Sequence, residues 1–517
     1  MIAGAGGAGG AGGAGGAGGA GERVRAVWDL SVPEIREYAG VHSYDGVVMD
    51  MSPAGIAAGL SRLGDGAPEL DRHDEAHLAA SEDALNVTYA TAEMHRWNPL
   101  VHLGNLDLAC YDREYAAVEE RLEARREHVS RWPGAVEASL ESLDRVPAPV
   151  AEALIGAVAG LATGVSDTAA LAAHARLCER IQHAAQHGDP GAALGPATLT
   201  ILLSKTEAMP VDLGRLEEAA DRERDRLWGR LAEDCERFRR GSGADPGSLV
   251  GELLGDHPDD DGIYAAARVV SDELAEFAVE ARLLPPLGGT CVVGPAPESR
   301  RFAMAMMSWT GPYEPEAPAR FYINPPDPAW DDSAKQDWRS VFSATTLPAI
   351  AAHEVTPGHY AHGRMIVQSA PGHVRRSLCS SAFVEGWAHY AEELLVETGF
   401  RAEDPRFAIG VWIEALVRVT RLAAALGIHG GTMSLEEATR RFERDAFLRG
   451  PAARSEATRA TFDPTYGRYT WGKLEIMKLR DEAIAAWGPR FSLLRFHESL
   501  LRLGAPPLGT MGDVLDG

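Results

Sequence analysis

Hydrophobic residues recur at intervals of three and four positions along most of this chain, and charged residues fill the positions between them. In residues 112–132, the apolar positions Val118, Leu122, Val129 and Trp132 follow this spacing. One face of an α-helix presents side chains with that period. The pattern therefore predicts a helix there, and further helices over residues 74–97, 147–187, 211–238 and 262–283.

Short stretches rich in glycine, proline and aspartate interrupt these helical segments. They read RWPG, HGDPG, GSGADPGS and GDHPDDDG. Residues of these types end helices and form turns. We expect each stretch to be a helix-to-helix turn, and none is long enough to be a linker between domains. Residues 22–285 are therefore predicted to form one continuous helical lobe.

The pattern changes between residues 286 and 345. GTCVVGP, RFAMAMMSW and ARFYINPP are short β-prone runs bounded by glycine and proline, which predicts a small antiparallel sheet. Helical periodicity returns over residues 346–366, with an interruption, and over 379–397, 405–426, 434–448 and 470–503. The predicted fold is mainly α, a large helical body with a small antiparallel sheet. Residues 22–517 are predicted to be a single domain, made of a helical lobe (22–285), the sheet (286–345) and a second helical lobe (346–517).

Two glycine-containing segments invite a nucleotide-binding interpretation, and neither supports it. An Ala-Gly-Gly repeat over residues 3–21 contains G-x-G-x-x-G, but no strand precedes it. It has no side chain that could pack, so residues 1–21 are predicted to be a disordered tail. GRYTWGKL has phosphate-loop spacing, but Leu474 occupies the position where a Ser or Thr must reach magnesium.

Composition restricts the partners and the compartment. The chain has 50 Lys and Arg against 75 Asp and Glu, a net charge of -25, which would repel nucleic acid and anionic membranes. Five scattered cysteines without a C-x-x-C pair indicate a reducing, cytoplasmic setting. No apolar run approaches the ~18 residues of a membrane span, and the N-terminus lacks a signal-peptide pattern. The oligomeric state stays open.

The segment HEVTPGH, from His353 to His359, departs from the H-E-x-x-H helix motif of zinc proteases by two positions. In that motif, two histidines four residues apart share one metal ion, and the glutamate between them is a general base. Six residues on an unbroken helix turn a side chain by about 240°. However, the ring of Pro357 would collide with the His353 carbonyl, and Gly358 supplies backbone freedom. We expect the segment to loop out by two residues, which returns His359 to the face of His353.

A third metal ligand is expected downstream, because catalytic zinc usually takes three protein ligands and a water. Glu385 lies in SSAFVEGWAHYAEELL, an apolar helical stretch where an unpaired carboxylate would be costly. His389 and Glu392 share its face at i+4 and i+7 and could hydrogen-bond to ligands. His362 is a further, alternative ligand. For His362 and His389 taken singly, a structural histidine without metal is the simpler interpretation.

HEVTPGH followed by FVEGWAHYAEE resembles the bacterial family known as domain of unknown function 885, whose signature is H-E-x-x-P-G-H and a later E-G-W-A. The likeness extends more loosely from HRWNPL through GIHGG to RYTWGKLEIMKLR, and so covers most of the chain after the tail. The family is similar to helical zinc peptidases of the thermolysin-like, glutamate-liganded class. This resemblance implies a zincin-like helical architecture, His353, His359 and Glu385 as ligands of one zinc ion, and Glu354 as general base.

The predicted function is a zinc-dependent hydrolase of peptide or amide bonds, in which Glu354 takes the proton of a metal-activated water. In the peptidases that the family resembles, a tyrosine and a histidine from a C-terminal segment stabilise the oxyanion. Tyr466, Tyr469 and His429 are the candidates here, and the alternative interpretation is aromatic packing and a loop histidine. The ligand types favour zinc and leave manganese, iron and cobalt open.

Two further features bear on a peptide substrate. One strand of the sheet expected over 303–324 could pair with an extended peptide by β-augmentation. Arg418, Arg421, Arg468 and Lys473 are possible anchors for a substrate carboxylate, which would make the enzyme a carboxypeptidase. Helix-surface charge is the alternative interpretation of these four side chains.

Two other hypotheses remain open. The first is a metal-dependent enzyme with the same ligands that acts on a small non-peptide amide or tailoring substrate in a closed pocket. The second is a non-catalytic helical binding protein in which HEVTPGH is a kinked structural helix. Glu354 argues against the second, because a scaffold without catalysis has no need of a base between two ligands.

Overall fold

A computed structural model describes residues 21–69, 71–239, 245–296 and 304–516. The predicted tail, residues 1–21, lies outside these ranges except for Gly21. Helices dominate the described part of the chain, as the hydrophobic periodicity predicts. The helices before the sheet are α1 (Glu22–Asp29), α2 (Val32–Glu34), α3 (Pro53–Leu60), α4 (Arg72–Asn86), α5 (Met94–Trp97), α6 (Leu100–Leu106), α7 (Val118–Ser142), α8 (Ala148–Gly160), α9 (Thr168–His187), α10 (Pro196–Thr206), α11 (Leu213–Phe238), α12 (Pro246–Leu254) and α13 (Asp260–Glu280).

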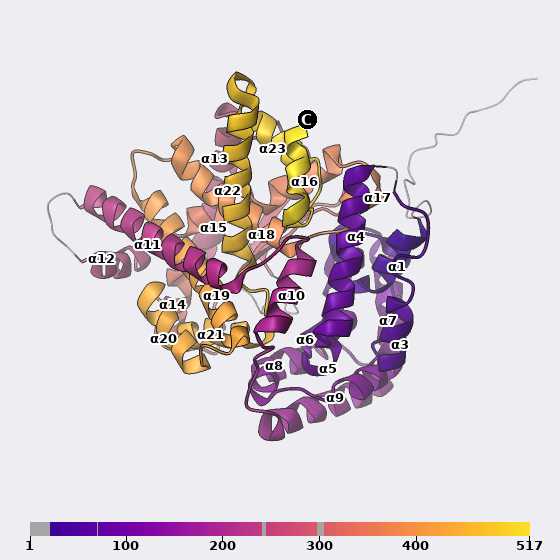
Figure 1. Cartoon of the computed structure of the whole chain (residues 1–517). Coiled ribbons are helices and arrows are strands. Elements are labelled where there is room, and N and C mark those ends of the chain that lie inside the picture. The colour runs from indigo at the N-terminus through magenta and orange to yellow at the C-terminus, as the bar shows by residue number, and fades with distance from the viewer. Residues whose placement is uncertain (1–20, 70, 240–244, 297–303, 517) are drawn as a thin grey trace, which may run out of the picture.

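Ten further helices follow the sheet within the described residues. They are α14 (Asp332–Ser340), α15 (Leu347–Glu354), α16 (His359–Ser369), α17 (Gly372–Ser377), α18 (Ser381–Thr398), α19 (Arg406–Gly430), α20 (Leu435–Asp445), α21 (Pro451–Phe462), α22 (Arg468–Trp487) and α23 (Leu493–Leu501). A 3₁₀ segment, η8 (Leu508–Asp516), ends the described chain. Figure 1 shows α1 to α9 on one side of the molecule, α10 in the middle and most of the later helices on the other side.

The predicted break at RWPG is wrong, because α7 runs through Pro133 to Ser142. A proline inside a helix removes one backbone hydrogen bond and crowds the preceding turn. Trp132 and Val136 beside it are fully buried. The free energy gained by burying such side chains against neighbouring helices offsets the free-energy cost of the proline within the helix.

Three segments predicted as single long helices are divided. In 74–97, a π-helical turn (Val87–Thr91) and Glu93, with a φ of 47°, separate α4 from α5. The other two segments are each divided at a glycine. The segment 147–187 forms α8 and α9, and 470–503 falls in α22 and α23. A glycine with positive φ lies at each of these two divisions, Gly164 at 69° and Gly488 at 51°. Glycine adopts this left-handed conformation without the cost that a Cβ imposes.

The three predicted strands are present as β1 (Cys291–Pro295), β2 (Ala305–Ser308) and β3 (Ala319–Ile323). The expectation of a purely antiparallel sheet is wrong. The order is β1-β3-β2, and β3 pairs antiparallel with β2 but parallel with β1. A short connection joins β2 to β3, and such a connection makes neighbouring strands antiparallel. No turn joins β1 directly to β3, so no local signal fixes their relative direction.

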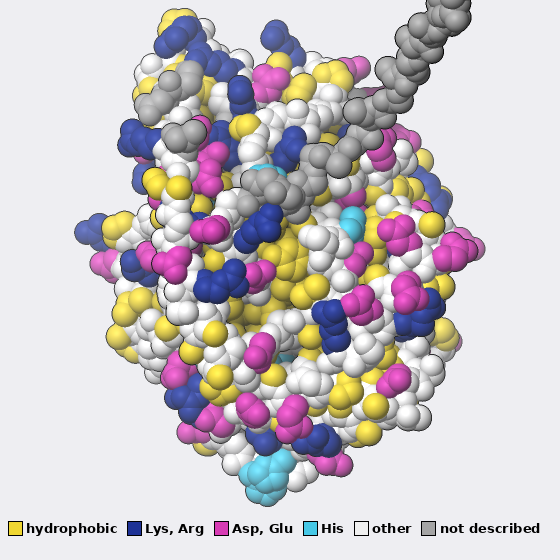
Figure 2. All heavy atoms as spheres, turned by 90° about the vertical axis from the view of Figure 1, so that its right-hand side faces the viewer, with side chains coloured by type: hydrophobic (Ala, Val, Ile, Leu, Met, Phe, Trp, Pro, Cys, Tyr) yellow, Lys and Arg dark blue, Asp and Glu magenta, His cyan; other side chains and the backbone are white. Residues whose placement is uncertain are grey.

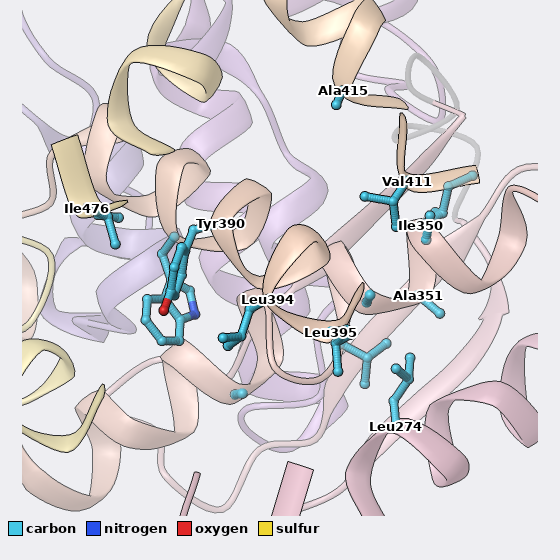
Figure 3. Close-up of a cluster of buried hydrophobic side chains, with 14 of the residues drawn as sticks. Leu274, Ile350, Ala351, Tyr390, Leu394, Leu395, Val411, Ala415 and Ile476 are labelled. Carbon is cyan, nitrogen blue, oxygen red and sulfur yellow. The ribbon is translucent and has the colours of Figure 1, made fainter. Parts of the chain in front are cut away.

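Helix α15, which ends in the first half of HEVTPGH, is buried along its length. Figure 3 shows Ile350 and Ala351 of α15 among Leu274 of α13, Leu395 of α18 and Val411 of α19. These side chains belong to the largest hydrophobic core of the described chain, while α5 to α9 enclose a smaller core. Rigid helices on several sides therefore hold the segment that carries His353.

Helices α18 and α22 cross at a pair of glycines. A Cβ on Gly386 would lie 2.5 Å from the Cα of Gly472. The missing side chains let the two backbones approach closely, as small residues do at helix crossings. This contact brings the C-terminal segment RYTWGK beside the helix that carries Glu385.

Figure 2 shows the face formed by the helices on the right of Figure 1. Hydrophobic side chains line a hollow in the middle of this face, and acidic and basic side chains are interspersed around it. Among the described helices, none is long and apolar enough to cross a membrane.

Candidate metal centre

The helix break in HEVTPGH has the two extra residues that the sequence predicts. The N–H of Gly358 donates to the carbonyl of Ala352 at 3.1 Å, and that of Ala361 donates to Val355 at 3.1 Å. Each bond spans six residues, whereas an α-helical bond spans four. Helix α15 ends at Glu354 and α16 begins at His359, so residues 355–358 form the break, and the hydrogen bonds across it enclose two residues more than a helical turn does.

Gly358 within the loop and Trp387 on α18 make this loop possible and fix it in place. A Cβ on Gly358 would overlap the carbonyl oxygen of His353, so only glycine fits there. The indole N–H of Trp387 donates to the carbonyl of Pro357 at 2.9 Å. The Thr356–Pro357 peptide bond is cis. The tryptophan of the EGWA segment thus fixes the loop that aligns the histidines.

His353, His359 and Glu385 come together, as predicted. Their ligand atoms all lie within 4.8 Å of one another. Oε2 of Glu385 is 3.4 Å from Nε2 of His353 and 3.3 Å from Nε2 of His359. Within the described chain this is the one group of its kind. The group is largely enclosed, since His353 is 4% exposed.

Glu392 lies against the far side of His353. The Nδ1–H of His353 donates to Oε1 of Glu392 at 2.6 Å, which leaves Nε2 as the metal-facing atom. The Arg418 guanidinium lies 3.3 Å from the same carboxylate and also donates to Glu414 at 3.1 Å. Glu392 is fully buried, so Arg418 balances its charge.

These charges perturb the protonation of the group. Burial and Arg418 lower the pKa of His353, but the carboxylates of Glu385 and Glu392 outweigh them and raise it to about 9. Burial raises the pKa of Glu385, whereas the two histidines lower it well below its usual value. Without an ion, a proton therefore occupies this group. A dication would take the place of that positive charge.

Glu354 follows His353 directly in the chain, and Tyr469 packs against His353. The half-buried carboxylate of Glu354 has no hydrogen bond or ion pair with any described residue. The ring of Tyr469 stacks on His353 with 6.3 Å between centroids and an interplanar angle of 25°. Burial and the Glu385 carboxylate raise the pKa of Tyr469, so its hydroxyl is a hydrogen-bond donor.

The other predicted site residues lie elsewhere or have partners. The hydroxyl of Tyr466 donates to Glu456 at 2.8 Å. His429 is buried at the C-terminal end of α19, about 16 Å along the helix from Arg418 at 1.5 Å per residue. The Nε2–H of His362 donates to the Gly504 carbonyl at 3.0 Å, outside the metal group.

His389 lies near Glu392 and, like His362, outside the metal group. Its Nδ1 is 3.6 Å from Oε2 of Glu392, beyond hydrogen-bond distance. Neither ring nitrogen has a hydrogen-bond partner among the described residues. Burial and the Lys473 ammonium lower the pKa of His389 to about 4, so it is neutral near pH 7.

The four predicted carboxylate anchors all have partners. Arg421 binds Glu456 through two hydrogen bonds, and Arg468 binds Asp463 in the same way. Arg418 and Lys473 are buried and paired with carboxylates.

Sequence reasoning missed three contributions to the site. These are the pairing of Arg418 with Glu392, the hydrogen bond from Trp387 to the Pro357 carbonyl and the position of Arg459. Trp387 lies in the conspicuous EGWA segment, but its partner, a backbone carbonyl, has no sequence signal. Arg459 is one of many arginines in the chain, and only the packing of α21 against α19 brings it over the ring of Tyr466.

The three side chains fit a zinc ion. Two imidazoles and one carboxylate are a common donor set for catalytic zinc. Donors about 2.1 Å from a tetrahedral ion are about 3.4 Å apart, close to the 3.3 and 3.4 Å observed here. Metal-bound histidines usually donate their other N–H to a protein group. His353 does so, while Nδ1 of His359 is buried without a described partner.

The fold and this group define a mainly helical protein with a candidate metal centre of two histidines and a glutamate. Residues 33–515 match the family described as "Bacterial protein of unknown function (DUF885)", and the chain belongs to that family. The resemblance noted from HEVTPGH and EGWA is therefore confirmed at the level of the family. A search of curated proteins finds no match.

Two solved structures share the fold across nearly the whole chain. One is described as a "putative lipoprotein of unknown function" from Shewanella oneidensis, with a TM-score of 0.75, 20% identity, and coverage of 96% of this chain and 98% of that chain. The other, a "putative lipoprotein" from Colwellia psychrerythraea, has a TM-score of 0.75, 15% identity, and coverage of 96% and 97%. At these identities the likeness establishes the fold alone.

Proposed function

We propose that this protein is a zinc-dependent hydrolase of peptide or amide bonds. The observation that carries the proposal is the convergence of His353, His359 and Glu385. Glu354, the next residue after His353, has no hydrogen bond or ion pair with a described residue and is the proposed base. A structural zinc site is closed by four protein ligands, whereas a catalytic site leaves a position open. Three protein donors leave room for water and substrate.

Each neighbouring side chain has a part in this proposal. His353, His359 and Glu385 would hold zinc, which when bound lowers the pKa of water and polarises a carbonyl. Glu354 accepts the proton of the attacking water and passes it to the leaving amine. Glu392 keeps His353 in the required tautomer and orientation.

Tyr469 is the best placed of the three proposed oxyanion donors. Its ring stacks on His353, and no described residue accepts a hydrogen bond from its hydroxyl. The hydroxyl is therefore available to a carbonyl oxygen as negative charge develops on it. The Tyr466 hydroxyl is occupied by Glu456, and His429 lies far along α19.

The sheet provides a way to hold an extended substrate. In the order β1-β3-β2, β2 is an edge strand, and it lies next to α15. An edge strand offers unpaired N–H and C=O groups to a peptide backbone. We propose that a peptide pairs with β2 and so passes the metal centre, which favours peptides over small closed-pocket amides.

We also propose a cytoplasmic location. All five cysteines are free of disulfide bonds, as in proteins of reducing compartments. The two structural neighbours described as lipoproteins make the envelope the competing location. Cell fractionation with an antibody against the chain decides between them, and recovery with the envelope fraction would contradict the cytoplasmic proposal.

The function is tested with purified protein loaded with zinc and a mixture of unstructured peptides and N-acyl amides, followed by mass spectrometry. We expect the wild type to cleave peptides. Glu354→Gln should bind the same amount of zinc and cleave at least a thousandfold more slowly, because the base is lost.

Three results would change the account. Cleavage of small amides alone would indicate the tailoring-enzyme hypothesis. No cleavage by the zinc-loaded wild type would favour a non-catalytic binding protein. Equal rates for wild type and Glu354→Gln would remove Glu354 from the mechanism.

A further inference from the structure

Arginines gather around two tyrosines beside the metal centre. The guanidinium carbon of Arg421 lies 4.9 Å from the ring centre of Tyr466 and 5.0 Å from that of Tyr469. Arg459 lies 4.4 Å from the ring centre of Tyr466. Tyr466 packs edge-on against Tyr469, which in turn stacks on His353. Positive charge is thus concentrated close to the proposed metal ligands.

Two of the three nearby arginines are fully engaged. Both Nε and Nη2 of Arg421 bond to Glu456, at 2.8 and 2.9 Å. Arg468 donates from Nη1 and Nη2 to Asp463, at 2.8 Å each. A bidentate pair of this kind satisfies the carboxylate-binding edge of a guanidinium. Neither side chain can bind a substrate carboxylate without losing its partner.

Arg459 differs from both. Its side chain donates no hydrogen bond to any described residue. The nearest carboxylate oxygen, Oδ2 of Asp463, is 3.7 Å from Nε and is already bonded to Arg468. The Arg459 side chain is 42% exposed, while the face of Tyr466 holds its guanidinium in place. It therefore presents an unused bidentate donor edge to solvent.

We propose that Arg459 binds the C-terminal carboxylate of a peptide substrate, so that the enzyme removes residues from the C-terminal end. This inference rests on the peptide hydrolysis proposed above. Arg421, Arg459 and Arg468 carry three positive charges, and Glu456 and Asp463 balance two of them. One substrate carboxylate neutralises the third and forms the bidentate pair that Arg459 lacks.

The test uses the full chain with zinc bound and Glu354→Gln as a non-cleaving background. The probe is acetyl-penta-alanine, as the free acid and as the C-terminal amide, and calorimetry measures both dissociation constants. With Arg459 present, we expect the acid to bind at least tenfold more tightly than the amide. Adding Arg459→Gln should bring the ratio close to one, and adding Arg459→Lys should keep part of it.

Arg454→Gln is the matched control. Arg454 lies on the same helix, is 49% exposed and pairs with Glu436 on the surface. We expect it to leave the acid-to-amide ratio unchanged. The unfolding temperatures of all the variants show whether each is folded, and a ratio lost only in Arg459→Gln assigns the carboxylate site.

Three results would overturn the inference. They are equal affinity for acid and amide with Arg459 present, a ratio that survives Arg459→Gln, and binding of neither peptide at millimolar concentration. These outcomes are distinct from failure of the proposed function. Cleavage of peptides without a preference for the free acid would keep the hydrolase and remove the carboxylate site. Tight Arg459-dependent binding of the acid without cleavage by zinc-loaded wild type would keep the carboxylate site and remove the hydrolase.

Discussion

Nδ1 of His353 lies 2.6 Å from Oε1 of Glu392. Glu392 is seven residues after Glu385 on α18, so two turns of one helix place both carboxylates on the same face. Helix α18 thus supplies one proposed ligand and the group that orients another. The packing of α15 against α18 brings His353 to both carboxylates.

Replacing Glu392 by Gln should weaken zinc binding by about ten- to a hundredfold. The amide keeps an acceptor for the His353 N–H but loses the charge that stabilises the metal-bound imidazole. Competition with a zinc chelator measures the change. Glu397→Gln on the same helix, where the side chain is 38% exposed and pairs with Arg480, is the control and should bind zinc as the wild type does. Equal affinity for both variants would show that Glu392 has no part in binding.

Replacing Tyr469 by Phe should lower kcat by about a hundredfold and leave KM and zinc content nearly unchanged. A donor that acts on developing charge contributes on this scale, and the ring stacking on His353 is kept. Tyr466→Phe, which removes a hydroxyl bound to Glu456, and His429→Ala should have smaller effects on kcat. A larger loss of kcat in either of these two variants would identify that residue as the oxyanion donor in place of Tyr469.

Replacing Gly358 by Ala should reduce zinc content and lower the unfolding temperature, because the new Cβ would overlap the His353 carbonyl. Gly156→Ala should have the opposite effect on the unfolding temperature. Gly156 is an exposed residue within α8 with nothing within 4 Å of its added Cβ. Alanine there should stabilise by about 0.5–1 kcal/mol. Thermal unfolding and metal analysis of both variants test the pair, and wild-type behaviour of Gly358→Ala would refute the tight loop.

Glu207 should make stability depend on pH. Burial raises its pKa to about 7, although Ser380 and the backbone of Leu508 donate hydrogen bonds to it. The folded state then holds a proton that the unfolded chain, with the usual pKa of 4.5, releases. Stability from this proton is complete below pH 4.5 and is lost as pH rises to about 7, by at most about 1.4 kcal/mol per pH unit.

Glu207→Gln removes this titration. Its unfolding temperature should rise relative to that of the wild type between pH 5 and pH 8, whereas the exposed control Glu152→Gln should follow the wild type. If the difference in unfolding temperature between Glu207→Gln and the wild type is the same at pH 5 and at pH 8, Glu207 does not titrate in this range.

Local chemistry made much of the site predictable. Pro357 forbids a continuous helix and Gly358 permits the loop, so sequence alone indicates two looped-out residues and the meeting of His353 with His359. Glu385 was predictable because a carboxylate in an apolar helix needs a partner. The strands were predictable from their β-prone composition and their glycine and proline boundaries.

Features that depend on distant contacts were not predictable. The parallel direction of β1 has no turn to specify it. Pro133 lies inside α7 because of burial across helices, against its local preference. The charges of Arg421, Arg459 and Arg468 look alike in sequence, and only the positions of Glu456 and Asp463 show which guanidinium is unused.

Metal content tests the central claim most directly. Purified wild type, His359→Ala and His362→Ala would be equilibrated with equimolar zinc, passed through a desalting column and analysed by elemental mass spectrometry. The account predicts one zinc per chain in the wild type and in His362→Ala, and a strong loss in His359→Ala. Folded wild type that retains no zinc, or His359→Ala that retains a full equivalent, would contradict it.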